Sequence, residues 1–119
     1  MAYMVILVLA QTDQLDAVVE AWRAVGATGI TVFQSINLAQ VEDRCRRDDL
    51  PLFPSMRDIF ENDEFDHYTL FTVIEGEALI DRLIAAAEQR IGDLDQPGNG
   101  VLVALPVARA KGLRQGRAG

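Results

Sequence analysis

The sequence has 119 residues, the size of one ordinary domain, and half of them are hydrophobic. This apolar content excludes a wholly disordered chain. The formal net charge of −7 argues against general nucleic-acid binding, because an acidic surface repels phosphates. We therefore expect a single domain over 1–119 that has a hydrophobic core and no nucleic-acid partner.

The first apolar run, residues 4–10, bears on where the protein resides. It is too short to cross a bilayer, which takes about 20 residues, and no basic segment precedes it as in a signal peptide. The single cysteine, Cys45, excludes an intrachain disulfide, which suits a reducing compartment. We expect a cytoplasmic protein without membrane insertion, with Cys45 as a spectator thiol.

The first part of the chain reads as strand, helix and strand. Residues 3–10 form a short, β-branched and continuously apolar run, which is typical of a central strand. Apolar residues then recur at helical spacing until Gly26, where we expect the helix to end, with Thr12 or Asp13 as its N-cap. Residues 29–36 alternate apolar and polar side chains, which predicts a second strand.

A long excursion follows, from residue 38 to residue 66, in which neither period is sustained. A segment of this length without regular structure is usually functional. Ser55 predicts a short helix over 55–60. Apolar side chains of the excursion are candidate docking residues for a partner protein, or they pack it back on the domain; they are Leu52, Phe53, Met56 and Phe60.

The second part of the chain repeats the order strand, helix and strand. The patterns predict a strand over 67–74 and a helix over 77–91, which Gly92 ends. After a loop over 93–100, residues 101–107 form an apolar run typical of a last strand.

Two features close the chain. Pro106 cannot donate to a strand ladder, so it must lie at a strand end or at a sheet edge. The tail over 108–119 is basic and holds no acidic residue.

This element order predicts the fold class. Two interleaved strand–helix–strand units give an α+β domain of ferredoxin-like type, βαββαβ, with a four-stranded antiparallel sheet. Both helices then lie on one face, and the long loop joins the second and third strands. The other face stays bare, and self-association is the simplest way to cover it.

The residues that could carry catalysis are few. The chain has one histidine, His67, and one cysteine, far apart in sequence, which do not make a closed zinc site or a Cys–His dyad. The carboxylates of the excursion lack the spacing of a calcium loop. We expect no metal site and no enzyme.

The two glycine-containing turns leave two interpretations open. Gly98, Asn99 and Gly100 form either a plain turn with positive φ or a nest of backbone N–H groups for an anion. Thr28 lies in an ordinary helix-to-strand turn or donates a hydrogen bond to a ligand.

The order of these turns, the excursion and the tail resembles one known family. Residues 26–32 read Gly-Ala-Thr-Gly-Ile-Thr-Val, residues 98–100 read Gly-Asn-Gly before an apolar strand, and residues 107–110 read Val-Ala-Arg-Ala. These motifs resemble the Gly-x-Thr-Gly-x-Thr-Val turn, the Gly-Asp-Gly stretch and the C-loop of the PII-like superfamily, the nitrogen-regulation signalling proteins. The excursion over 38–66 lies where that family has its T-loop.

The resemblance implies a homotrimer that binds adenine nucleotides in clefts between subunits, with no tightly bound cofactor. It also implies that the excursion docks on a target protein. Thr28 would face the adenine, the Gly-Asn-Gly turn would approach the phosphates, and the tail would add cations. The nucleotide-binding residues by this resemblance are Thr28, Gly29, Gly98, Asn99, Gly100, Lys111 and Arg114.

The chain also departs from the family pattern. Val101 stands where the family has a phosphate-binding lysine, Gly112 replaces a C-loop arginine, and residues 93–96 are acidic rather than basic. Each lost charge-assisted contact is worth about 1.5–3 kcal/mol. Two alternatives therefore stay open: a structural interaction protein without a ligand, and a small enzyme on a ferredoxin-like oligomer.

Overall fold

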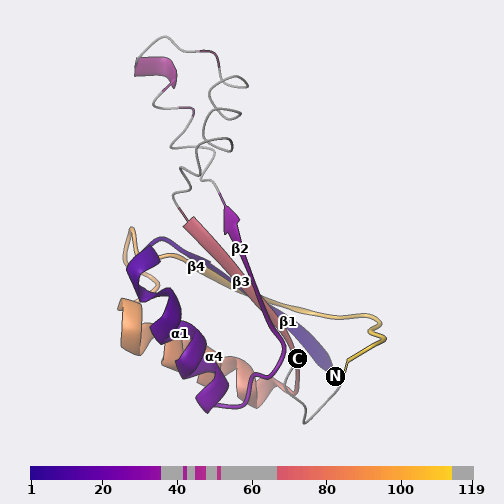
Figure 1. Cartoon of the computed structure of the whole chain (residues 1–119). Coiled ribbons are helices and arrows are strands. Elements are labelled where there is room, and N and C mark those ends of the chain that lie inside the picture. Colours follow the sequence, from indigo (N-terminus) through magenta and orange to yellow (C-terminus); the bar gives the residue numbers. More distant parts are fainter. Residues whose placement is uncertain (36–41, 43–44, 48–50, 52–66, 114–119) are drawn as a thin grey trace.

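The computed structural model describes residues 1–35, 42, 45–47, 51 and 67–113. They form a four-stranded antiparallel sheet with two helices on one face (Figure 1), which confirms the predicted ferredoxin-like α+β fold. The elements, in chain order, are β1 (Ala2–Leu9), the 3-10 turn η1 (Thr12–Gln14), α1 (Leu15–Ala24), β2 (Ile30–Ser35), β3 (His67–Glu75), α4 (Glu77–Ile91) and β4 (Val101–Pro106).

The strand order is β2-β3-β1-β4, and every neighbouring pair is antiparallel. Each helical connection therefore crosses over one intervening strand, as two interleaved units require. β1 and β3 occupy the centre and β2 and β4 the edges. Pro106 ends the edge strand β4, where its missing N–H costs no ladder hydrogen bond, as predicted.

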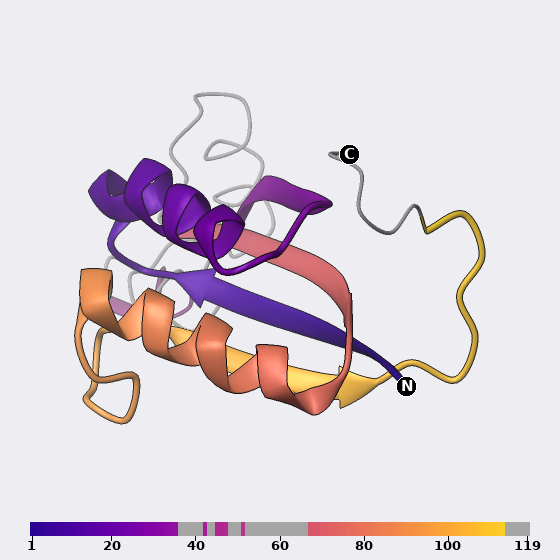
Figure 2. The same cartoon turned by 90° about the horizontal axis from the view of Figure 1, so that it is seen from below.

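The core lies between the sheet and the two helices, which pack side by side on the same face (Figure 2). Trp22 of α1 is fully buried, and its Nε1–H donates to the carbonyl oxygen of Leu83 in α4 at 3.1 Å. This bond joins the helices within the apolar layer. The largest fully buried side chains are Trp22, Leu7, Leu9, Leu70, Leu83, Val5, Val18 and Thr72.

The start of α1 differs from the prediction. Neither Thr12 nor Asp13 caps it, because both lie in η1, and Gln14 takes the N-cap position without a side-chain hydrogen bond. The 3-10 turn occupies the residues where a cap was expected and leads directly into α1 through Gln14, whose φ of −95° and ψ of 4° lie outside the α-helical region.

The end of α1 is as predicted. Gly26 has a φ of +117°, its N–H bonds to the carbonyl oxygen of Arg23, and the N–H of Ala27 bonds to that of Trp22. This pair of bonds is a Schellman motif, which favours glycine at the left-handed position.

Most of the excursion, including the helix expected over 55–60, lies outside the described residues. Residues 42 and 45–47 are helical, and Cys45 is buried, with its Sγ 3.9 Å from the carbonyl oxygen of Pro51.

Candidate functional site

The sheet face opposite the helices, which we call the open face, is the main candidate surface. Because side chains alternate along a strand, the register assigns its residues to cross-strand rows. One row holds Phe33, Thr69, Val8 and Val101; the next holds Thr31, Phe71, Ile6 and Val103; the third holds Val73, Met4 and Leu105. These three rows contain no charged side chain.

The edge strands expose most of this apolar surface. Val101, Val103 and Leu105 of β4 keep 59%, 46% and 41% of their surface in contact with solvent, and Phe33 of β2 keeps 48%. Phe33 and Phe71 meet edge to face with their ring centroids 6.3 Å apart. Monomeric proteins rarely leave so continuous an apolar surface in water, so this face has the character of an interface.

Polar groups gather at the end of the open face from which the excursion departs. The Thr69 hydroxyl donates to the Ser35 hydroxyl at 3.0 Å. His67, which pairs with Ser35 in the register, is buried, and its Nδ1 has no hydrogen-bond partner among the described residues. His67 is thus a buried strand residue beside hydroxyl groups.

The loop between α4 and β4 contains the Gly-Asn-Gly turn and is held by its own side chains. The Asn99 amide donates to the Asp93 carbonyl oxygen at 2.7 Å and accepts from the Gln11 side chain at 3.2 Å. Gln11 also donates to the Ile91 carbonyl oxygen at 2.8 Å. The Asn99 side chain is therefore already bonded inside the subunit, a contact that nothing in the sequence around Gln11 signals.

Gly100 shows why this turn needs glycine. Its φ is +124°, and a Cβ there would lie 2.6 Å from the carbonyl oxygen of Val8. Gly98 also has a positive φ, of +87°, but a Cβ at that position would meet no atom within 4 Å. At Gly100 any side chain would collide with the backbone of β1, so only glycine fits there. At Gly98 there is room for a side chain, and only the positive φ favours glycine.

Thr28 and Gly29 lie at the opposite edge of the sheet from this turn. Both are exposed and precede β2, whose first residue pairs with Thr72, whereas Val101 at the start of β4 pairs with Val8. With strands about 4.8 Å apart and a rise of about 3.3 Å per residue, the first residues of the two strands, Ile30 and Val101, are roughly 17 Å apart, and the turns that precede them are farther apart still. One subunit therefore does not bring its predicted nucleotide-binding residues together.

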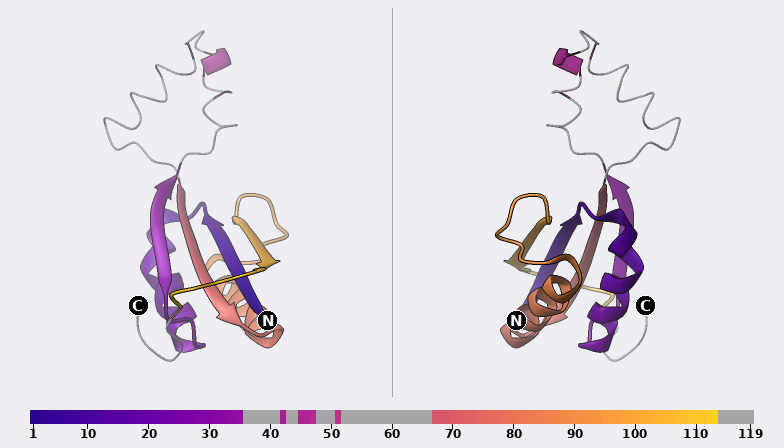
Figure 3. Two further views of the ribbon diagram at one scale, coloured as in Figure 1. Left: turned by 90° about the vertical axis from the view of Figure 1, so that its right-hand side faces the viewer. Right: turned by 90° about the vertical axis from the view of Figure 1, so that its left-hand side faces the viewer.

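Residues 107–113, which comprise Val107 and the first part of the tail, cross the open face, and we call this segment the strap. It leaves the β4 edge and runs toward the β2 edge, over the end where β1 begins (Figure 3). Lys111 lies on the strap and is exposed. Among the other predicted residues, Arg114 and the docking candidates Leu52, Phe53, Met56 and Phe60 lie outside the described residues.

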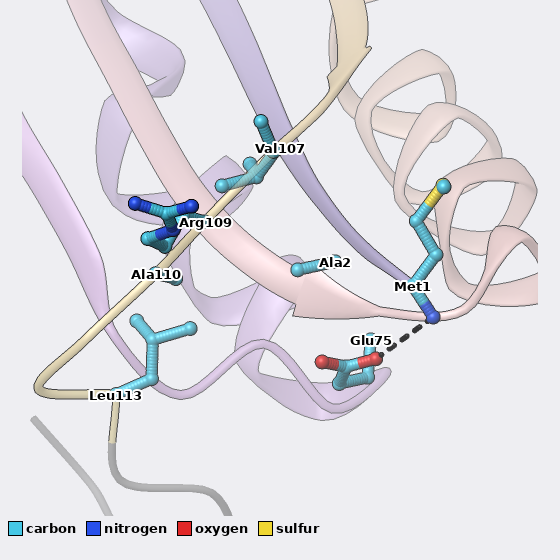
Figure 4. A pocket seen from close by; sticks show the side chains of 8 residues that line it. Met1, Ala2, Glu75, Val107, Arg109, Ala110 and Leu113 are labelled. Atoms are coloured by element: carbon cyan, nitrogen blue, oxygen red, sulfur yellow. Dashed lines mark ion pairs between the residues drawn. The ribbon is translucent and has the colours of Figure 1, made fainter.

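A hollow of about 620 Å³ lies under the strap (Figure 4). Arg109 and Leu113 line it from the strap, and Met1 and Glu75 line it from the sheet. The Met1 ammonium lies 3.3 Å from Glu75 Oε2. The basic composition of the tail was the only sequence signal for this hollow.

The remaining observations concern metal-ligating groups, electrostatics and helix length. The described residues include no group of three or more metal-ligating side chains that could hold an ion. The clearest electrostatic effect is at Tyr3, whose hydroxyl donates to Glu77 at 2.9 Å; this hydrogen bond, with some burial and the carboxylate charge, raises the pKa of Tyr3. The described helices include none long and apolar enough to cross a membrane.

Comparisons with known proteins bear on the fold. No family model matches the chain, and no curated protein matches it. Among solved structures, the chain is similar to GlnK of B. subtilis in its complex with ATP, with a TM-score of 0.54 and 10% sequence identity. The match covers 90% of this chain and 82% of that chain. At this identity the likeness is one of fold alone: the chain has the fold of a PII-type protein.

Proposed function

We propose that this protein is a PII-like trimeric regulator that binds a small molecule, with an adenine nucleotide as the candidate, in clefts between its subunits. The observation that carries the proposal is the open face, whose three charge-free rows leave Phe33, Val101, Val103 and Leu105 exposed. Copies of the chain that pack these faces together remove the apolar surface from water.

The positions of the two turns support a cleft between subunits. Thr28 and Gly29 lie beside one edge of the sheet, and the Gly-Asn-Gly turn lies beside the other. A ligand that contacts both turns must therefore be shared by two subunits, the β2 edge of one and the β4 edge of the next. Lys111 and Arg114 of the tail are the cations that we propose for its phosphates.

Regulation would pass through the excursion over 38–66. We propose that ligand binding shifts its conformational population and so permits or blocks docking of a partner protein by Leu52, Phe53, Met56 and Phe60. Such a protein acts by binding rather than by catalysis and resides in the cytoplasm.

One observation favours the alternative of an interaction protein without a ligand. The Asn99 side chain is occupied by Gln11 and Asp93, and Asp93 and Asp95 place negative charge beside the turn. The oligomer would then serve only to present the excursion.

Thermal unfolding with AMP, ADP, ATP and cyclic AMP separates the two functions. A nucleotide at a hundred times its Kd stabilises the folded state by about 2.7 kcal/mol, a shift of several degrees in Tm. Thr28→Val should reduce this shift, whereas Thr12→Val, an exposed threonine in η1, should not. No shift with any of the four at millimolar concentration would contradict nucleotide binding and favour the alternative.

A further inference from the structure

The hollow under the strap is a candidate binding site that does not depend on the proposed function. The strap is anchored where it begins, since the Val107 N–H donates to the Ala2 carbonyl oxygen at 2.9 Å. It then passes over the start of β1 and the end of β3 and borders an open hollow of about 620 Å³ (Figure 4). This volume lies within the range of about 300–1,000 Å³ that is usual for small-molecule sites.

The charges around the hollow favour an anion. Glu75 is paired with the Met1 ammonium at 3.3 Å, so Arg109 gives the groups around the hollow one excess positive charge. Arg109 has no hydrogen bond or ion pair with any residue in the described part of the chain. Its guanidinium is thus a free positive charge on a chain of net charge −7, and its planar fork matches the two oxygens of a carboxylate.

The other side chains that line the hollow are apolar. Ala2 lies on the sheet side, and Val107 and Leu113 lie on the strap, where Leu113 keeps 46% of its surface exposed. Inorganic phosphate would pair with Arg109 but leave these side chains in water. A ligand with both a carboxylate and a short branched alkyl chain would cover them.

We propose that the hollow binds a small organic monocarboxylate, with its carboxylate on Arg109 and its alkyl chain against Ala2, Val107 and Leu113. All of these groups belong to one chain, so the site is complete within a single subunit.

The test is a titration with 4-methylpentanoate in which two-dimensional NMR monitors the backbone amide signals. The intact mass of the protein is checked first, to confirm that Met1 is retained. We expect saturable shifts centred on Ala2, Val107 and Leu113. Arg109→Gln should raise the Kd about fivefold to tenfold, as expected for a partly exposed charge-assisted bond. Arg90→Gln, in the last turn of α4 and outside the hollow, should leave it unchanged.

A second variant gives an effect of opposite sign. Glu75→Gln removes the negative charge and frees the Met1 ammonium for the ligand, so the Kd should fall at least twofold. Because this variant is expected to gain affinity, a folding defect cannot imitate the result.

Four results would overturn the proposal. They are shifts that do not saturate, equal affinity for the uncharged 4-methylpentanamide, equal affinity for inorganic phosphate, and an unchanged Kd in Arg109→Gln. Nucleotide binding is measured separately, so its absence would remove the proposed function without deciding this one.

Discussion

Replacing Val103 by aspartate tests whether the open face is an interface between copies of the chain. Val103 lies in the middle row of this face, on the edge strand β4, with 46% of its surface exposed. The substitution places a charge at the centre of the proposed contact and leaves the helix-facing core untouched.

The expected effect follows from exposure. Full burial of a side chain of this size stabilises by about 1.5–3 kcal/mol. Because Val103 keeps 46% of its surface exposed in the single subunit, burying the rest in an assembly would contribute about 1 kcal/mol to association. In Val103→Asp this contribution to the free energy of association is lost. Burying the new carboxylate in the interface without a partner costs several kcal/mol more. At 1.4 kcal/mol per factor of ten, association should weaken by about a thousandfold.

Analytical ultracentrifugation over a range of protein concentrations measures this effect directly. The control is Ala104→Asp, since the next residue of β4 is also exposed but points to the opposite face. We expect Val103→Asp to be a folded monomer by circular dichroism and Ala104→Asp to assemble like the unsubstituted protein. Unchanged assembly of Val103→Asp would refute the reasoning.

Three further predictions concern stability. Thr72 is fully buried, and its hydroxyl has no hydrogen-bond partner among the described residues. Thr72→Val should therefore raise the free energy of unfolding, measured by denaturant titration, by about 1–2 kcal/mol. The control Thr69→Val removes the hydrogen bond to Ser35, so it should not raise the free energy of unfolding. Gly100→Ala should cost more than about 2 kcal/mol, because its Cβ would meet a β1 carbonyl oxygen at 2.6 Å, and Gly98→Ala should cost less; equal losses would count against the close approach. The pKa of Tyr3 is raised by its hydrogen bond to the α4 carboxylate, so the bond's contribution is complete below about pH 10 and is lost above it as the phenol ionises. Between about pH 9 and 11, the Tm of Tyr3→Phe should therefore fall less steeply than the Tm of the unsubstituted protein. If the Tm of both proteins falls with pH at the same rate, this prediction is contradicted.

The layered fold was predictable from the sequence because the hydrophobic periodicity and the glycines that end the helices indicated the same element boundaries. Helix α4 has the predicted bounds, since its apolar stripe is long and Gly92 ends it. Gly26 likewise marked the end of α1. The N-cap prediction at Thr12 or Asp13 was wrong, because a 3-10 turn can occupy the same residues without a change in the apolar pattern.

The site was harder to predict, because its contacts join residues far apart in the chain. Gln11 reaches Asn99 across 88 positions, and the Met1 ammonium pairs with Glu75. Neither pairing leaves a local pattern. The bare sheet face was predictable from topology alone, but the rows that make it continuous required the strand register.

The mass of the unsubstituted protein in solution tests the central claim, that the open face is covered by other copies of the chain. Sedimentation equilibrium at low micromolar concentration should give about three times the chain mass of 13.1 kDa. A single species of 13.1 kDa that persists up to high micromolar concentration would contradict it.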